Sequence, residues 1–316
     1  MRKYDIVFLK KTEAKMEIVK PFVKWAGGKG SLIPQLTKFY PYQLKDGIIT
    51  KYVEPFVGGG AVLIDILQKY EVKEVYAFDI NIDLINCYNV IKNDVNGLIT
   101  KLKQMEIEFL DLDSDDREKY FYDVRKEYNS YKISEEELST KRAAEFIFLN
   151  RTCFNGLYRV NRKGEFNVPF GKYKNPKICD SNNLTNLSSV FQNVVFKYGD
   201  YKKSSEYVDN TTFVYFDPPY RPLSVSSGFT SYTKENFNDE NQKELARYFR
   251  ELSGKDAKLM LSNSNPKNTN KDDDFFEEIY TGFNINEVLA RRMINADCTG
   301  RGAISELLIT NYEENQ

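Results

Sequence analysis

Short apolar runs and longer amphipathic runs alternate along two stretches of the chain. In residues 51–92, apolar runs at 52–57 and 72–80 predict strands, and each is followed by an amphipathic run that predicts a helix. In residues 194–263, three short apolar runs end in polar residues, and residues 238–252 have the pattern of a helix. Such alternation is typical of parallel strands with helices on both faces of a sheet, and ligands bind at the carboxyl ends of these strands.

Residues 93–190 lack this alternation and are predicted to be helical at first and then rich in loops. Because 316 residues at about 150 per domain suggest two domains, we expect a second domain inserted into the first. The first domain would then consist of residues 19–92 and 191–316. Residues 1–18 are charged and are predicted to form an N-terminal extension without an assigned function, in which Met16 leaves open a shorter translated form.

Composition narrows the class of protein. Hydrophobic residues make up 41% of the chain and charged residues 29%, as in soluble globular proteins. The absence of histidine excludes Ser/His/Asp and Cys/His triads, histidine-ligated zinc hydrolases and zinc deaminases. The four cysteines form no CxxC pair, so we expect neither a metal site nor a redox motif. No apolar stretch approaches the ~18 residues of a membrane span and the start is no secretory signal, so we expect a cytoplasmic protein.

The formal net charge of -1 hides two segments of opposite charge. Segment 106–118 has seven acidic residues and one arginine, whereas segment 151–177 has seven basic residues and one glutamate. A single charged run is more often a solvated face, but basic residues mixed with aromatic residues and asparagine suit contact with nucleic acid. The aromatic residues of the basic segment are Phe154, Tyr158, Phe166, Phe170 and Tyr173.

Three glycines, Gly58 to Gly60, follow the first predicted strand and open the first predicted helix. Backbone without Cβ atoms lets a ligand approach the helix amides, although a plain tight turn would use glycine equally well. The GxGxxG pattern is not met, because Leu63 stands where the third glycine belongs. Asp79, about 20 residues further on at the end of the next strand, is suited to bind ribose hydroxyls. The turn and the carboxylate together predict a cofactor that contains a nucleoside.

A second glycine motif, PFVKWAGGKGSL at residues 21–32, superficially suggests a phosphate-binding loop. The Walker pattern fails, because Val23 stands where its first glycine belongs and Gly30 where Ser or Thr belongs. We therefore expect no nucleoside triphosphate site. Trp25 and Lys29 would suit an aromatic and cationic wall of a binding site, and a packed tryptophan beside a turn explains them equally well.

The third motif is DPPY, Asp217 to Tyr220, directly after the apolar run FVYF. Two prolines fix φ and remove two amide donors, which leaves a rigid loop whose carbonyls can accept hydrogen bonds. A structural turn explains the prolines, but not the carboxylate before them and the aromatic ring after them at the end of a strand. These four residues predict a pocket for a planar amine.

Nine short segments follow one another in a specific order. They are KWAGGK (24–29), EPFVGGGA (54–61), FDIN (78–81), NGLYRVNRKGEFNVPFGKYKNPK (155–177), YGD (198–200), DPPY (217–220), FTSYT (229–233), LSNS (261–264) and RGAISELLITNY (301–312). In this order they resemble the Dam-type DNA N6-adenine methyltransferases of the alpha group, which use S-adenosylmethionine, and in particular the GATC-specific members. The resemblance covers nearly the whole chain after the extension. It implies an α/β fold with a Rossmann-like methyltransferase sheet and an inserted, mainly helical target-recognition domain at 93–190, in which segment 151–177 contacts DNA.

The resemblance also implies roles for individual residues. Catalysis is expected of Asp217, Pro218, Pro219 and Tyr220. Cofactor binding is expected of Trp25, Ala26, Gly27, Gly28, Lys29, Glu54, Pro55, Phe56, Gly58, Gly60, Asp79, Ile80, Asp200 and Asp217. DNA binding is expected of Lys24, Arg151, Phe154, Asn155, Leu157, Arg159, Asn167, Pro169 and Lys172. In the last group, Arg159 is suited to bidentate reading of a guanine edge.

The implied reaction begins with a poor nucleophile, because the lone pair of adenine N6 is delocalised into the ring. The base must be flipped out of the duplex to meet the cofactor. Tyr220 would stack on the ring, and Asp217 and the Pro218 carbonyl would accept the two amine hydrogens during direct displacement at the methyl group. We expect double-stranded DNA as substrate, a monomer and no membrane partner, and a cognate restriction endonuclease that acts separately is compatible with this reaction.

Three alternatives stay open from the sequence. DPPY-like loops also occur in methyltransferases that act on RNA or on protein glutamine amides, although the basic segment and the NGLYR match favour DNA. A non-catalytic binding module would have no need of intact Asp217 and Tyr220. A dehydrogenase would use the glycine turn with Asp79 but leaves DPPY unexplained.

Overall fold

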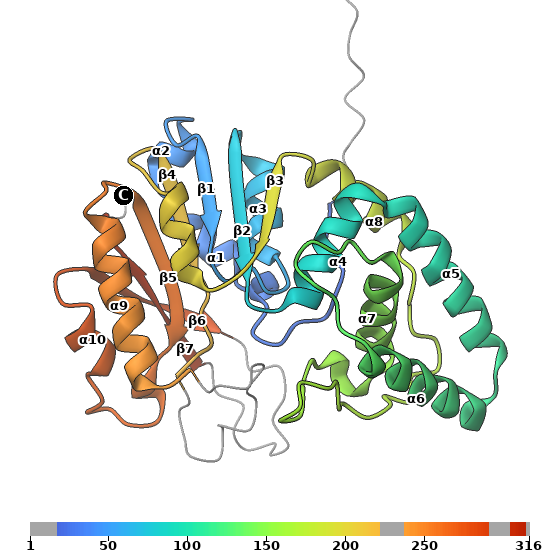
Figure 1. Ribbon diagram of the computed structural model, residues 1–316. Helices are drawn as coiled ribbons and strands as arrows, with labels where there is room; N and C mark the ends of the chain where they lie inside the picture. The colour runs from blue at the N-terminus through green and yellow to red at the C-terminus, as the bar shows by residue number, and fades with distance from the viewer. Residues whose placement is uncertain (1–17, 222–236, 291–303, 314–316) are drawn as a thin grey trace, which may run out of the picture.

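The computed structural model describes residues 18–221, 237–290 and 304–313. Nearly all of the N-terminal extension and the FTSYT segment at 229–233 lie outside these ranges. The described chain forms a seven-stranded sheet with helices on both faces and a helical lobe at one side (Figure 1). None of the described helices is long and apolar enough to cross a membrane.

Five parallel strands form the part of the sheet that the alternating pattern predicts. They are β1 (Lys51–Glu54), β2 (Glu74–Asp79), β3 (Val194–Tyr198), β4 (Thr212–Phe216) and β5 (Lys258–Ser264). The strand order is β3-β2-β1-β4-β5-β7-β6, so β1 lies between β2 and β4. The residues that follow β1, β2, β3 and β4 therefore lie along one edge of the sheet.

Two further strands, β6 (Asn284–Ala290) and β7 (Ile304–Thr310), complete the sheet. Strand β7 pairs antiparallel with β5 on one side and with β6 on the other. The sequence pattern missed this pair, because no helical pattern separates the two strands and the alternation that marks the other five is absent. Strand β7 carries Glu306 to the carboxyl end of β5, opposite Ser264.

Alternate residues of the central strands point to opposite faces and divide the core into two clusters. On β4, Phe213 and Tyr215 belong to one cluster, and Val214 and Phe216 belong to the other. The helices of the first face are α1 (Ile33–Phe39), α2 (Tyr42–Lys45), α3 (Ala61–Lys69) and α4 (Ile82–Asn93), and those of the second are α9 (Asp239–Ser253) and α10 (Phe275–Ile279).

The lobe contains α5 (Val95–Asp111), α6 (Ser114–Ser130), α7 (Thr140–Thr152) and α8 (Ser181–Val190). Asp94, Asp113 and Ser139 begin α5, α6 and α7, because each side chain accepts an amide hydrogen of the first helical turn. Between α7 and α8 the chain has little regular structure, as predicted. The short 3₁₀ helices are η1 (Lys29–Ser31), η2 (Phe154–Gly156), η3 (Tyr201–Tyr207) and η5 (Pro266–Asn268).

The lobe and the sheet share one hydrophobic core. A single cluster joins Leu84 of α4 to Leu98, Phe121 and Phe148 of the lobe. A buried ion pair crosses the same boundary: Arg142 of α7 is fully buried and donates to the Asp83 carboxylate of α4 at 2.8 and 3.1 Å. Helix α4 thus packs on the sheet and on the lobe at once.

Candidate active site

The glycine turn lies between β1 and α3, at the edge of the sheet where the parallel strands end. Gly58 and Gly60 have φ angles of 46° and 72°, in the left-handed region that favours glycine. The Asp79 carboxylate, at the end of β2, accepts the amide hydrogen of Gly58 with an N···O distance of 3.0 Å. Its other oxygen accepts the amide hydrogen of Asn81 at 2.8 Å. The structure therefore joins the turn and the carboxylate that the sequence suggested as a pair.

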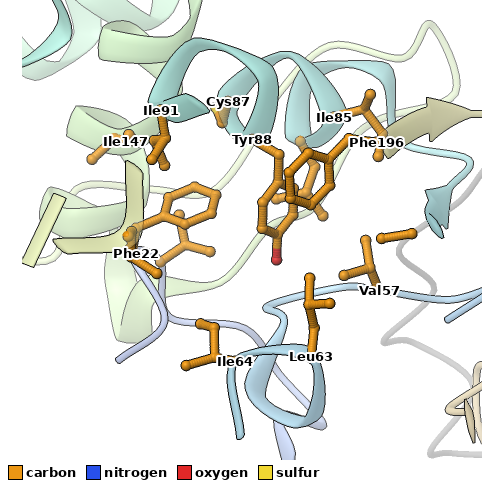
Figure 2. Close-up of a cluster of buried hydrophobic side chains, with 14 of the residues drawn as sticks. Phe22, Val57, Leu63, Ile64, Ile85, Cys87, Tyr88, Ile91, Ile147 and Phe196 are labelled. Atoms are coloured by element: carbon orange, nitrogen blue, oxygen red, sulfur yellow. The ribbon is translucent and has the colours of Figure 1, made fainter. Parts of the chain in front are cut away.

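Tyr88 of α4 supports the turn from the core. Its hydroxyl donates to the Gly58 carbonyl at 2.8 Å, and its ring stacks on Phe196 with centroids 4.6 Å apart. Figure 2 shows this ring among Phe22, Ile85 and Phe196, with the hydroxyl directed toward the segment that carries Val57 and Leu63. A Cβ atom on Gly60 would lie 2.4 Å from the Tyr88 hydroxyl oxygen. The turn is thus closely fitted against an aromatic side chain that is fully buried.

Burial changes the acidity of the carboxyl groups around the turn. It raises the pKa of Asp79 to about 6, although hydrogen bonds from the Asn81 and Gly58 amides oppose the shift. Glu54, at the end of β1, is 2% exposed and accepts the Tyr52 hydroxyl at 2.7 Å. Burial also raises the pKa of Glu54 well above its ordinary value. Both carboxyl groups therefore stay protonated to a higher pH than exposed carboxyl groups do.

The DPPY loop follows β4 at the same edge. The Asp217 carboxylate lies 2.7 Å from the Lys29 ammonium, which is 3% exposed and also donates to the Gly27 carbonyl at 2.7 Å. The same ammonium lies 4.6 Å from the centre of the Tyr220 ring. Burial raises the pKa of Asp217 to about 6, and the charge of Lys29 limits the rise. Carboxylate, ammonium and aromatic ring are thus brought together from two distant segments.

Several polar side chains fix the DPPY loop from outside it. Gln242 of α9 donates to the Pro219 carbonyl at 3.0 Å and accepts from the Asn263 amide at 3.0 Å. Asn263 in turn accepts the backbone amide hydrogen of Arg221 at 3.2 Å, and the Tyr220 hydroxyl donates to Glu306. The hydrogen-bonded atoms of the DPPY loop are therefore held in place by the sheet or by α9.

The Arg221 side chain anchors the end of the loop. Its guanidinium pairs with Asp239 at 2.8 Å and with Asp273 at 2.8 Å, and it lies 4.2 Å from the centre of the Phe275 ring. Sequence reasoning assigned no role to Gln242, Asn263, Arg221 or Glu306. A usable signal existed for two of them, because Asn263 belongs to the polar end of the apolar run LMLSNS and Glu306 is a charged residue in the mainly apolar run ISELLIT.

The loop at residues 24–29 packs against the glycine turn. Trp25 is half-buried, and its ring stacks on Tyr158 of the lobe with centroids 5.5 Å apart. A Cβ atom on Gly58 would lie 3.0 Å from the Trp25 ring nitrogen, so the indole lies directly against the turn. Trp25 therefore packs against the lobe and also forms a wall beside the turn. The neighbouring Ala26, Gly27 and Gly28 are exposed.

The other predicted cofactor residues lie along the same edge. Phe56, after β1, stacks on Tyr201 with ring centroids 5.2 Å apart, and Pro55 beside it is buried. Ile80, after β2, is 55% exposed. Asp200, after β3, is exposed and caps η3 with its side chain. The ends of three neighbouring strands thus contribute to one region.

The predicted DNA-binding residues from 154 to 172 are mostly exposed. Phe154 is 51% exposed, and Asn155 and Lys172 both have a φ of 54°, which is uncommon for residues other than glycine. The Arg159 guanidinium is exposed and donates to the Asn167 side chain at 2.7 Å. Pro169 is exposed and its carbonyl accepts the amide hydrogen of Phe154 at 2.8 Å, and Leu157 is half-buried.

Two parts of the basic segment face inward. The half-buried Arg151 guanidinium donates to the Phe22 carbonyl at 2.7 Å, a position that suits bracing the chain better than contacting DNA. Phe166 and Phe170 are 3% and 7% exposed and belong to the core, so the expectation that they form part of a DNA-contact surface is wrong. Sequence composition cannot assign faces in a segment without helical or strand periodicity.

The architecture defines the class of protein. The strand order, the glycine turn after β1 and the acidic residue at the end of β2 are those of a Rossmann-like methyltransferase sheet, as predicted. The sequence also matches the D12 class N6 adenine-specific DNA methyltransferases over residues 25–294. The chain belongs to this family, which confirms the resemblance and makes the protein an adenine-specific DNA methyltransferase.

Relatives of this family align over nearly the full chain. The Type II methyltransferase M.MjaIII of Methanocaldococcus jannaschii is 54% identical over 93% of this chain and 99% of its own. The Type II methyltransferase M1.LlaDCHI of Lactococcus lactis subsp. cremoris is 40% identical, over 93% and 96%. The DNA adenine methylase of Haemophilus influenzae is 35% identical, over 92% of each chain.

Proposed function

We propose that the enzyme transfers a methyl group from S-adenosylmethionine to N6 of an adenine flipped out of double-stranded DNA, within the sequence GATC. One observation carries the proposal. The Asp217 carboxylate, the Lys29 ammonium and the Tyr220 ring meet at the edge of the sheet that also holds the glycine turn and Asp79. An extruded adenine needs a stacking ring and an acceptor for its amine hydrogens, and this group supplies both.

The residues around the glycine turn fit the proposed cofactor. The bonds from Gly58 and Asn81 hold the Asp79 carboxylate at the turn, where ribose hydroxyls can donate to it. Gly60 has no Cβ atom at the start of α3, so the turn packs directly on the Tyr88 hydroxyl, which also holds the Gly58 carbonyl. Phe56 and Trp25 add flat apolar surfaces, and we assign Asp200 to the adenosyl amine. When bound, S-adenosylmethionine supplies the electrophilic methyl group.

Cofactor affinity is expected to fall as the pH drops through about 6. The ionised Asp79 carboxylate is the better hydrogen-bond acceptor, and burial holds its pKa at about 6 in the free enzyme. Binding favours the ionised form, so affinity is full above this pKa and is lost below it. Calorimetric titration with S-adenosylmethionine from about pH 5 to about pH 8 measures the inflection, which should shrink in Asp79→Asn. An unchanged inflection in that variant would instead assign it to Asp217, whose pKa is also about 6.

At the target base, the chain orients the adenine amine without forming a covalent bond to it. Asp217 and the Pro218 carbonyl accept the two amine hydrogens, which localises the nitrogen lone pair toward the methyl group. The positive charge of Lys29, 2.7 Å away, favours the ionised state of Asp217 and holds its orientation. Tyr220 stacks on the flipped ring while its hydroxyl is held by Glu306.

We assign DNA contact to a surface formed by Lys24 and residues 154–172. Lys24 comes from the distant N-terminal loop, yet its ammonium lies 4.6 Å from the centre of the ring of Tyr173, the residue directly after this segment. Lys24, Asn155, Leu157, Arg159 and Pro169 are the residues that match the recognition positions of the GATC-specific members. Because basic side chains bind phosphates by releasing counterions, affinity for DNA is expected to fall steeply as salt increases.

Arg159→Ala is expected to relax recognition at one guanine of the site. If its guanidinium forms two hydrogen bonds to that base, the variant loses about 1–3 kcal/mol of discrimination there. Competition between GATC duplexes and duplexes altered at each guanine measures the change. The control is Arg162→Ala, which removes an exposed charge of the same segment and should weaken all duplexes alike. Equal effects of the two variants would contradict base reading by Arg159.

The chain divides by role in this proposal. Residues 93–190 recognise the target, and residues 19–92 with 191–316 bind the cofactor and carry out transfer. We expect a cytoplasmic monomer with no membrane partner. Two of the relatives are named Type II methyltransferases, which supports a cognate restriction endonuclease that acts separately.

The direct test is incubation of the purified protein with S-adenosylmethionine and unmethylated DNA, followed by mapping of modified bases. N6-methyladenine confined to GATC is the expected result. N6-methyladenine at other sequences would overturn the recognition assignment alone. Measurable cofactor binding without DNA methylation would favour an RNA or protein amide substrate.

A further inference from the structure

Asn150 lies in the last turn of α7, is 2% exposed and belongs neither to the DPPY loop nor to the glycine turn. Its side-chain oxygen accepts the amide hydrogen of Lys24 at 2.9 Å. Its amide group donates to the Lys24 carbonyl at 2.9 Å and to the Gly156 carbonyl at 3.0 Å. One buried side chain therefore holds both backbone polar groups of Lys24 and, at the same time, the backbone of the segment that begins the recognition surface.

Both segments that Asn150 holds contribute to the proposed DNA-contact surface, and the segment of Lys24 also continues to the cofactor side of the site. Lys24 is followed directly by Trp25, which lies against the glycine turn, and by the loop that ends at Lys29 beside Asp217. Gly156 lies between Asn155 and Leu157, two of the proposed recognition residues. The amide of Asn150 is thus the shared hydrogen-bond partner of the cofactor side and the DNA side.

Packing around Asn150 joins the same two segments. A Cβ atom on Gly156 would lie 2.4 Å from a side-chain carbon of Lys24, so the two segments are in direct contact. The Trp25 ring stacks on Tyr158, and Arg151 binds the Phe22 carbonyl at 2.7 Å. If one segment moves, the other segment must therefore move with it, or these contacts break.

We propose that Asn150 is a positioning residue that couples target recognition to the cofactor side of the site. The inference rests on the proposed function, because it concerns the recognition residues and the cofactor loop of that reaction. Asparagine suits the task, since the side chain has one acceptor and two donor hydrogens and all are used. An aspartate in its place would set a carboxylate against two carbonyl oxygens, which repels both segments at almost unchanged volume.

The coupling predicts two measurable properties of the wild-type enzyme. DNA that carries the preferred site should raise the affinity for S-adenosylhomocysteine, the product form of the cofactor, by about fivefold or more. DNA that carries a single altered base should raise it less. In Asn150→Asp, both enhancements should approach one, and the ratio of kcat/KM on preferred and altered duplexes should fall about tenfold or more.

A matched control is a second asparagine that holds the same N-terminal segment at Lys20. Asn183 of α8 accepts the Lys20 amide hydrogen at 2.9 Å and donates to the Lys20 carbonyl at 2.9 Å, the same two-bond clamp without a link to the recognition segment. Asn183→Asp should leave the coupling and the kcat/KM ratio unchanged. If Asn150→Asp fails to fold, Asn150→Ser takes its place, because the hydroxyl keeps one hydrogen bond in a smaller side chain.

The experiment compares the three proteins by calorimetry with and without duplex and by methylation rates on both duplexes. The preferred site is the one that the wild-type enzyme itself modifies, so a site other than GATC alters the proposed function without affecting this test. A ratio and an enhancement in the Asn150 variant equal to those of wild type would overturn the inference. So would equal losses in the Asn150 and Asn183 variants, because they would indicate a purely structural clamp.

Discussion

Asp217→Ala is expected to lower kcat for adenine methylation by about 10³-fold or more while DNA affinity is largely retained. The carboxylate is the proposed acceptor for an amine hydrogen, and Asp217 is the one acidic residue of the DPPY loop. The alanine variant also leaves the Lys29 ammonium, 3% exposed, without its carboxylate. It should therefore lose about 3 kcal/mol of unfolding free energy as well.

Asp217→Asn separates these two effects, since it keeps the size of the side chain and removes its charge. Its control is Asp209→Asn, because Asp209 pairs with Lys51 at 2.7 Å at the opposite end of β4. Single-turnover methylation and duplex binding are measured for both. Near-normal turnover in Asp217→Asn, or an equal loss in Asp209→Asn, would sink the catalytic assignment of Asp217.

Gly60→Ala is expected to weaken binding of S-adenosylmethionine by about 10²-fold. The new Cβ would lie 2.4 Å from the Tyr88 hydroxyl oxygen, and the Tyr88 ring cannot retreat because it stacks on Phe196 and meets Phe22 edge-on at 5.0 Å. The glycine turn must move instead, and with it the Gly58 amide that holds Asp79. Calorimetric titration of the cofactor measures the loss.

Gly47→Ala is the control, because Gly47 has a φ of 71° and a Cβ there would meet nothing within 4 Å. It shares the backbone strain of about 1 kcal/mol but not the collision, so cofactor affinity should be unchanged. Adding Tyr88→Phe to Gly60→Ala removes the colliding oxygen and should restore part of the affinity. Identical behaviour of Gly60→Ala and Gly47→Ala would contradict a role for the glycine turn in binding.

The sequence predicted the five parallel strands and the residues at their ends, because each strand is a short apolar run closed by a glycine or a polar residue. The local pattern of apolar and polar residues is sufficient to predict these positions, because Asp79 and Asp217 directly follow the apolar runs that form the strands. The antiparallel pair β6 and β7 has no intervening helix to mark it, and the pattern passed over it.

Residues whose role depends on tertiary contact could not be found in this way. Asn150 and Lys24 are 126 positions apart, and nothing in the neighbourhood of either predicts that they share hydrogen bonds. Gln242 lies on the buried face of α9, where its pattern is that of any core-facing position, yet it fixes the Pro219 carbonyl. Phe166 and Phe170 show the opposite error. They lie in a segment whose composition is typical of DNA contact, yet their side chains fill the core.

The continuous core between the lobe and the sheet limits how such enzymes can acquire new target sequences. A lobe exchanged between two relatives would arrive with its half of the cluster around Leu98, Phe121 and Phe148 and would have to fit a foreign α4. The buried Arg142 guanidinium would also need an aspartate at position 83 of the recipient protein to form its ion pair. Specificity is therefore expected to diverge by substitutions at the exposed positions of residues 154–172, and chimaeras made at the lobe boundaries should be mostly insoluble.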